Sequence, residues 1–213
     1  RTAPTANLSS MAMIGVDYRS ASLATREALA VPDGELGNAL ASLAERVSEG
    51  FILSTCNRTE IYACLDHPAP GEALRDFLAA SRGTPRAVVD AVTTVRQGRD
   101  ALEQLFEVST GLNSMMVGEP HILTQVRAAL DAARNAGTLG SMLSRAGEAA
   151  LRVGKRARAE TGITRNGHSI PHVATDKIMA HLSFMPRFEH LVIAANEERG
   201  MAQDIFRKLR KEL

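Results

Sequence analysis

The chain of 213 residues is long enough to bury a hydrophobic core, and 45% of its residues are hydrophobic. Its formal net charge of +1 excludes a generally basic, nucleic-acid-coating surface, so any RNA must be bound through a local patch. The sequence has two cysteines, no signal-peptide pattern and no apolar run near the roughly 20 residues that span a bilayer. We therefore expect a cytoplasmic protein that does not enter membranes.

The first half of the chain alternates between strand-like and helix-like patterns. Residues 1–10 are polar and without periodicity, which is typical of a loose arm or a tag remnant. Ser22 and Asp33 are each expected to cap a helix, and Gly50 is expected to end the second one. The expected elements are a strand over 11–18, helices over 20–30 and 33–50, a hairpin over 51–65, a helix over 70–82 and a strand near 90–97.

The second half is mainly helical. Apolar residues at helical spacing predict helices over 100–112, 120–137 and 141–162. A further helix over 166–183 is expected to act as a bridge, and residues 184–213 are expected to form one strand and one basic helix. The fold class that follows is α+β: a small sheet with helices, a helical subdomain, a bridging helix and a strand–helix stub that must dock to bury its faces.

The segment FILSTCNRTEIYACL, residues 51–65, places Cys56 at the tip of the expected hairpin, beside Arg58. Cys56 is either a small apolar filler at a strand end or a thiolate held out to react. A free thiol is only a few per cent ionised at neutral pH, and a positive neighbour such as Arg58 increases that fraction. Thiolates attack acyl esters, including the ester that joins an amino acid to tRNA. A disulfide with Cys64 is not expected, because two residues on one strand arm lie too far apart.

LSTCNRTEIY resembles the active-site signature of glutamyl-tRNA reductases, the enzymes that commit glutamate to tetrapyrrole synthesis. Three more segments resemble that family in the same order: IGVDYRSASLATREAL, LFEVSTGLNSMMVGEPHILTQV and VGKRARAETGI. The resemblance implies that residues 11–165 form the family's catalytic domain. In that domain the cysteine attacks the glutamyl-tRNA ester and forms a thioester, which hydride from NADPH reduces to an aldehyde.

The resemblance makes Cys56 the nucleophile. It puts Thr55, Arg58 and Ser114 around the glutamyl group, where the planar fork of Arg58 suits a carboxylate. Four further residues fall on matched motif positions and either bind substrate or form structural hydrogen bonds around the loop: Arg26, Glu60, Glu119 and Gln125.

Gln104 stands where the family has its active-site histidine. We count Gln104 among the substrate-binding residues, although glutamine hydrogen-bonds without shuttling a proton. His121 and His172 are candidate acid–base replacements. His168, His172 and Asp176 recur at four-residue intervals, but Pro171 interrupts the helix they would share and we expect no metal site.

The segment RVGKRAR carries four cations within two helical turns: Arg152, Lys155, Arg156 and Arg158. They contact tRNA phosphates or form a solvated helix face with cations near its C-terminus. The resemblance favours tRNA binding.

The segment LVIAANEER, residues 191–199, resembles the family's NADPH-binding turn LVIGAGEMG but puts Ala194, Asn196 and Arg199 at its three glycine positions. Side chains there obstruct the tight turn and the approach of pyrophosphate. We therefore expect residues 184–213 to be a degenerate remnant that binds no NADPH and that can support a homo-oligomer.

The resulting hypothesis is acyl capture from aminoacyl-tRNA on Cys56, with transfer to an unidentified acceptor nucleophile instead of reduction. One alternative is a reductase that is shortened or that obtains NADPH from a separate partner. The other alternative is a non-catalytic protein that binds tRNA or the reductase.

Overall fold

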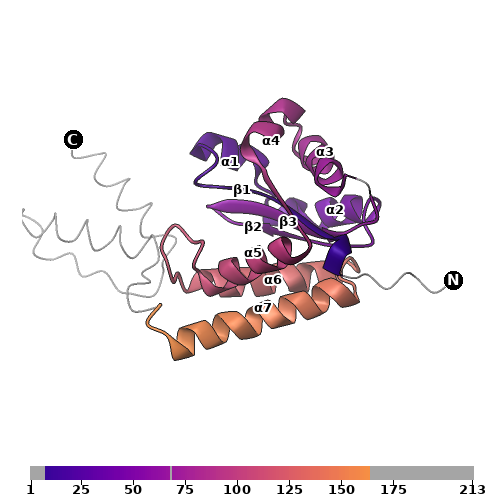
Figure 1. Cartoon of the computed structure of the whole chain (residues 1–213). Coiled ribbons are helices and arrows are strands. Elements are labelled where there is room, and N and C mark those ends of the chain that lie inside the picture. The colour runs from indigo at the N-terminus through magenta and orange to yellow at the C-terminus, as the bar shows by residue number, and fades with distance from the viewer. Residues whose placement is uncertain (1–7, 68, 164–213) are drawn as a thin grey trace, which may run out of the picture.

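A four-stranded antiparallel sheet with the strand order β2–β3–β1–β4 lies at the centre of the fold (Figure 1). The computed structural model describes residues 8–67 and 69–163. The strands are β1 (Met11–Asp17), β2 (Glu49–Ser54), β3 (Arg58–Cys64) and β4 (Thr94–Gln97). The bridging helix over 166–183, His172 and the stub over 184–213 lie outside the described residues.

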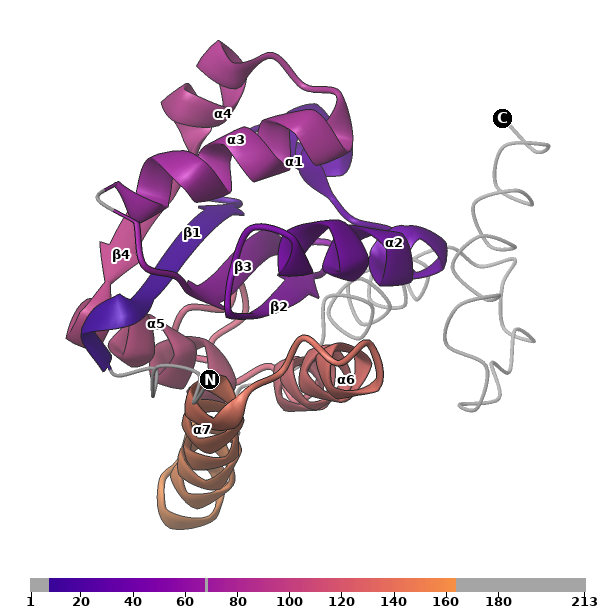
Figure 2. The same ribbon diagram turned by 90° about the vertical axis from the view of Figure 1, so that its right-hand side faces the viewer.

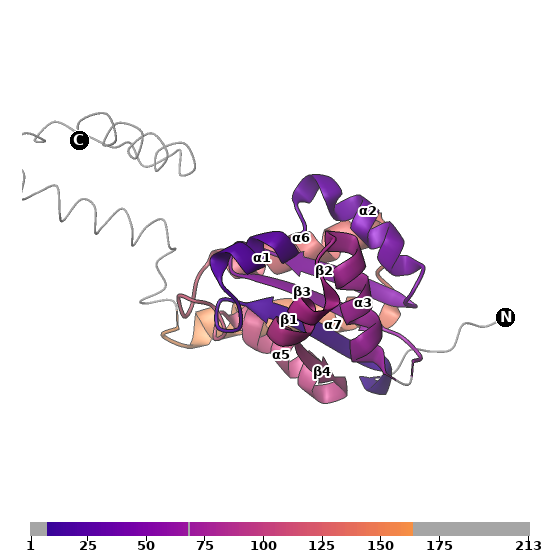
Figure 3. The ribbon, with the colours of Figure 1, turned by 90° about the horizontal axis from the view of Figure 1, so that it is seen from above.

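Helices cover both faces of the sheet. Figure 2 shows one group above the strands, namely α1 (Leu23–Leu29), α3 (Pro70–Arg82) and α4 (Arg86–Val92). The opposite face carries α5 (Gly98–Thr110), α6 (His121–Asn135) and α7 (Ser141–Glu160). From above, α2 (Asp33–Ala44) lies at the β2 edge and β4 forms the opposite edge (Figure 3). The α+β fold class is thereby confirmed.

The inner strands β1 and β3 are buried along almost their whole length. Their apolar residues join those of the helices in one hydrophobic core. Polar side chains interrupt this core in β3, where Arg58 and Glu60 are both 2% exposed. Because buried charges need hydrogen-bonding or charged partners, the groups around Arg58 and Glu60 must occupy defined positions.

Two predicted helix boundaries were wrong. Ser22 caps α1 as expected, since its hydroxyl accepts a hydrogen bond from the Thr25 amide. Pro32, not Asp33, is the residue before α2, and the Asp33 side chain makes no cap. The helix ends at Ala44, and Gly50 belongs to β2, because the ladder with β3 requires residues 49–54 to be extended.

Two short helices were missed. Part of the strand expected near 90–97 is helix α4, which starts after Pro85 and carries an Arg86–Asp90 ion pair of 2.9 Å across one turn. Leu8–Ser10, assigned to the loose arm, form a 3-10 turn. Its Ser10 carbonyl accepts a hydrogen bond from the Leu65 amide. Arg86 also forms ion pairs with Glu72 and Asp76 of α3, and the Ser10–Leu65 bond joins distant positions, so neither set of contacts is visible in the local pattern.

Helix α7 packs closely against both the sheet and the neighbouring helix α5. The carboxylate of Glu49 on β2 accepts hydrogen bonds from the amides of Met142 and Leu143, which would otherwise be unpaired at the start of α7. Farther along α7, a Cβ on Gly154 would lie 2.5 Å from the Ser109 carbonyl oxygen of α5. Glycine at position 154 therefore sets the distance between α5 and α7.

Gly154→Ala is expected to lower the free energy of unfolding by about 1–2 kcal/mol. The clash with a backbone carbonyl outweighs the gain in helix propensity, which is at most about 1 kcal/mol. Gly37→Ala in α2 is the matched control, because no atom lies within 4 Å of its added Cβ. It should stabilise the chain by about 0.5–1 kcal/mol. Urea denaturation measures both, and equal effects of the two changes would contradict the close approach.

Candidate active site

The loop between β2 and β3 is a tight turn that holds Cys56 at its tip. The Thr55 amide donates to the Arg58 carbonyl at 2.8 Å, and the Thr55 hydroxyl accepts from the amides of Asn57 and Arg58 at 3.2 Å each. These hydrogen bonds between Thr55 and the residues that follow Cys56 close the turn. The Cys56 side chain is exposed, and the thiol is free.

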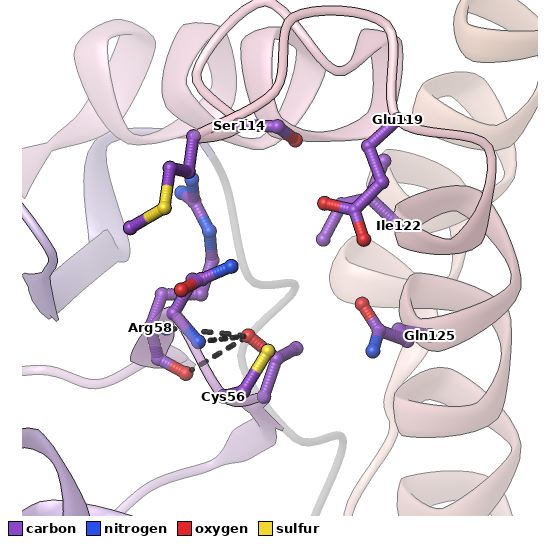
Figure 4. Close-up of a pocket in the computed structure, with 9 residues that line it drawn as sticks. Cys56, Arg58, Ser114, Glu119, Ile122 and Gln125 are labelled. Carbon is purple, nitrogen blue, oxygen red and sulfur yellow. Dashed lines mark hydrogen bonds between the residues drawn. The ribbon is translucent and has the colours of Figure 1, made fainter. Parts of the chain in front are cut away.

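Cys56 borders a pocket to which three parts of the chain contribute. Figure 4 shows the Cys56 sulfur facing a gap, with Glu119 and Gln125 across from it and Ser114 above. The lining residues are Thr55, Cys56, Asn57, Arg58, Ser114, Met115, Glu119, Ile122 and Gln125. The enclosed volume is about 10 Å³, close to that of one water-sized group.

The segment between α5 and α6 delivers Ser114, Met115 and Glu119 to this pocket. Gly111 and Gly118 both have a φ of +81°, a conformation that side chains rarely adopt. The Gly118 amide donates to the Gly111 carbonyl at 3.1 Å, so the segment returns on itself. A Cβ on Gly111 would lie 3.1 Å from the Gly118 Cα, and this close return requires glycine.

Arg58 lines the pocket, but its charge is already paired. Its Nη1 donates to Glu60 Oε1 at 2.9 Å, and its Nη2 donates to the Asn113 carbonyl. The guanidinium is almost fully buried in this arrangement. The positive charge expected beside the Cys56 thiol is therefore compensated by Glu60.

Glu60 is the centre of a buried polar network. Besides Arg58, it accepts hydrogen bonds of 2.8 Å from the Tyr62 hydroxyl and from Gln104 Nε2. Burial raises the pKa of Tyr62 well above its usual value, and the charge of Glu60 and its hydrogen bond act in the same direction. Tyr62 thus remains a hydrogen-bond donor. The side-chain amide of Asn113 donates to Gln104 Oε1 at 3.2 Å, which ties α5 to the pocket segment.

The family assignment follows from the sequence over this same region. A family model described as the N-terminal domain of glutamyl-tRNAGlu reductase matches residues 14–161. The chain belongs to the glutamyl-tRNA reductase N-terminal domain family. Cys56, the network and both pocket segments all lie within the matched range.

Individual relatives agree with the assignment. Glutamyl-tRNA reductase from Roseiflexus castenholzii is 38% identical over 184 residues, which cover 86% of this chain and 43% of the relative. The Salinispora arenicola reductase is 43% identical over 162 residues, covering 74% and 35%. The solved structure of glutamyl-tRNA reductase from Methanopyrus kandleri superposes with a TM-score of 0.62 at 27% identity, covering 82% and 40%. The chain thus spans less than half the length of these relatives.

Three residues predicted at the site do not line the pocket of this reductase-family domain. Gln104 lies within the buried network. Arg26 Nη1 donates to the Ala21 carbonyl at 2.8 Å, and His121 is the exposed first residue of α6. The placement of Gln104 follows from a contact between α5 and β3, which the motif spacing does not contain.

The cations of α7 divide into two groups. Arg152, Lys155 and Arg156 are exposed, and Arg156 forms an ion pair with Glu160 at 3.0 Å. Arg158 instead donates to the Glu119 carbonyl at 3.1 Å, and burial lowers its pKa. Arg158 therefore uses one of its N–H donors within the domain, unlike the exposed Arg152 and Lys155. It supports the pocket segment.

The sequence interpretation also missed several residues of the site and its network, among them Tyr62, which is bonded to Glu60. Asn57, Met115 and Ile122 line the pocket, and Asn113 joins the network to it. Each lies next to or between motif residues, but nothing in the residue types distinguished them from spacers.

The described residues contain no group of three or more potential metal ligands. None of the helices in residues 8–67 and 69–163 combines the length and hydrophobicity that crossing a membrane requires.

Glu60→Gln is expected to lower the free energy of unfolding by about 3 kcal/mol or more, because it leaves the Arg58 charge buried without its counter-charge. Glu72→Gln is the control, since Glu72 forms exposed ion pairs with Arg75 and Arg86. Such pairs are screened by solvent, and the control should change stability far less. Chemical denaturation monitored by circular dichroism compares them. Equal losses would show that the buried pair has no special role.

The two cysteines should differ sharply in reactivity. Burial raises the pKa of the Cys64 thiol to about 12, and the Glu49 charge contributes to the rise. Below that pH Cys64 stays protonated, and thiols react only slowly. Iodoacetamide at about pH 8 should therefore modify Cys56 in the native chain and leave Cys64 unmodified. Peptide mapping checks this, with Cys56→Ser as the unlabelled control; modification of native Cys64 would contradict it.

Proposed function

We propose that this chain captures an aminoacyl group, glutamyl in the first instance, from aminoacyl-tRNA as a thioester on Cys56. The thiolate sulfur attacks the ester carbonyl carbon and a carbon–sulfur bond forms. The bond from that carbon to the ribose oxygen breaks, and tRNA leaves once its oxygen takes up a proton. The observation that carries the proposal is the free, exposed Cys56 thiol at the mouth of a polar pocket in a chain of this family.

The polar groups facing Cys56 suit an amino acid. The Glu119 carboxylate is a partner for the α-ammonium, whereas Ser114 and Gln125 can donate hydrogen bonds to acyl or side-chain oxygens. A pocket of about 10 Å³ is too small for a glutamyl group, so binding requires movement of the lining. Met115 is partly exposed and has an unbranched, flexible side chain, which makes it the residue best able to move.

The exposed cations of α7 support contact with tRNA close to this pocket. Arg158 touches the Glu119 backbone, so this part of α7 lies beside the pocket segment. Lys155 is three residues earlier, about 5 Å along the helix axis. Arg152 and Lys155 can therefore meet phosphates near the acylated end of a tRNA, and such contacts weaken with salt.

For the bound acyl group, we favour transfer to a nucleophile over reduction. Gln104, at the position of the family's histidine, cannot transfer a proton. Ala194, Asn196 and Arg199 replace the glycines of the dinucleotide turn. In the transfer step the acceptor attacks the thioester carbonyl, the carbon–sulfur bond breaks and the Cys56 thiolate is regenerated.

A second candidate is reduction of the same thioester by NADPH bound to a separate partner or domain, as part of tetrapyrrole synthesis. It is favoured by the relatives, which are named glutamyl-tRNA reductases. In the third candidate, the chain binds tRNA or a reductase without chemistry and Cys56 serves only the scaffold.

Incubation with glutamyl-tRNA should give a glutamyl adduct on Cys56, detected by intact-protein mass spectrometry after an acid quench. Acid preserves the thioester because few nucleophiles remain unprotonated. Cys56→Ser should lack the thioester, while Cys64→Ser should retain it. A wild-type chain that stays unmodified, or an adduct that persists without Cys56, would contradict the proposal.

The fate of the thioester is tested on the isolated adduct. We expect a small amine to remove the glutamyl group as an amide, whereas NADPH alone leaves the adduct unchanged. Calorimetry with NADPH should detect no binding to the chain. Oxidation of NADPH with release of an aldehyde would favour the reductase and rule out our assignment of the second step.

A further inference from the structure

A second cavity lies on the same face of the sheet, beyond Glu60 from the Cys56 pocket. Its volume is about 240 Å³, far larger than the space beside Cys56. It is lined by Gly15, Asp17, Arg19, Ser20, Glu60, Thr94, Arg96 and Gln104. None of these residues lines the Cys56 pocket, so the two spaces are distinct and have the Arg58–Glu60 pair between them.

The floor of this cavity follows from the strand register. In the antiparallel sheet Gly15 lies between Thr94 on β4 and Glu60 on β3, and directly opposed residues point to the same face. A Cβ on Gly15 would lie 3.0 Å from Glu60 Cγ and 3.3 Å from Met13 Sδ. A side chain at position 15 would collide with Glu60 and Met13, so glycine lets these two side chains lie close together at the cavity floor, which Gln104 of α5 borders.

The cavity has an uncompensated positive charge. Asp17 is paired with Arg19, and Glu60 is paired with Arg58. Burial tends to raise the pKa of Asp17, but the hydrogen bonds and charge of Arg19 outweigh it and hold that pKa below its usual value. Asp17 therefore stays ionised and cancels Arg19.

Arg96 is the lining cation that remains. Within the part of the chain that the structure describes, its side chain makes no hydrogen bond or ion pair. Arg96 lies opposite Met13 on β1, and Met13 lies opposite Tyr62 on β3, so the Arg96 side chain is on the same face of the sheet as Tyr62 and Glu60. The cavity thus contains an arginine fork with nothing to bind among the described residues.

We propose that this cavity binds a small carboxylate ligand through Arg96. A planar guanidinium pairs with a carboxylate through two parallel hydrogen bonds. One N–H of Gln104 Nε2 is bonded to Glu60, and its second N–H can donate to the same ligand. Asp17 and Glu60 disfavour a group that concentrates two negative charges at Arg96, as phosphate does, more than a carboxylate that carries one charge there. The volume, below the roughly 300 Å³ of ordinary ligand pockets, limits the ligand to the size of an amino acid or a short dicarboxylic acid.

The test is a titration with glutarate, monitored by the backbone amide NMR signals of Thr94–Gln97. These residues belong to β4 and line no part of the Cys56 pocket. Saturable shifts there are expected for the wild-type chain. Arg96→Met should weaken binding at least about tenfold, because one charge-assisted interaction is lost. Arg96→Lys, which keeps the charge without the fork, should give an intermediate affinity.

Arg145→Met is the matched control, because Arg145 is an exposed arginine on α7 away from the cavity lining. It should bind glutarate as the wild type does. The proposal is overturned if glutarate shifts no β4 signals, if Arg96→Met binds unchanged, or if phosphate binds as tightly as glutarate. Cys56→Ser should retain glutarate binding even though it cannot form a thioester, so this inference and the proposed function can fail separately.

Discussion

The buried ion pair between Arg58 and Glu60 is the constraint on which the rest of the site depends. A charge removed from water must keep its partners, since an unpaired buried charge costs several kcal/mol. Here the partners come from different elements: Tyr62 from β3, Gln104 from α5 and Asn113 from the segment before α6. All of them are satisfied together only in one arrangement of sheet, helix and segment.

That arrangement explains why the Cys56 loop faces Ser114 and Glu119. Arg58 follows Cys56 by two residues, and its guanidinium holds the Asn113 carbonyl next to Ser114. The hydrogen bond from Arg58 to the Asn113 carbonyl therefore connects the two walls of the pocket. Arg58 thus holds the two pocket walls in place, while its charge is used by Glu60. What separates Cys56 from Cys64 is exposure, since burial keeps the Cys64 thiol protonated.

The same pair separates two spaces of different character. The Cys56 side is narrow and contains an exposed thiol, whereas the Arg96 side is larger and contains an arginine that no described residue pairs. Glu60 and Gln104 are shared between the network and the roomy side. Gln104 is bonded to Glu60, and Glu60 is paired with Arg58. A ligand that contacts Gln104 would therefore be linked to the Cys56 side through these two contacts.

The sequence by itself determined much of the fold and the position of the exposed cysteine. Helix α3 was predicted at its observed bounds, because Pro70 at its first turn and Gly83 after its end are strong local signals. The Cys56 motif specified a hairpin tip, which the strand bounds confirm. These features depend on residues near one another in the chain.

Only the tertiary structure decided where the charges go. Arg58 donates hydrogen bonds to Glu60 and to the Asn113 carbonyl, and Arg158 donates to the Glu119 carbonyl. The bonds to Asn113 and Glu119 join distant segments of the chain. Local pattern shows that a residue can carry charge, but not whether the fold has already paired it. The Arg96 cavity likewise depends on the strand register, which brings residues of β1, β3 and β4 together and becomes visible only once the strands are assembled.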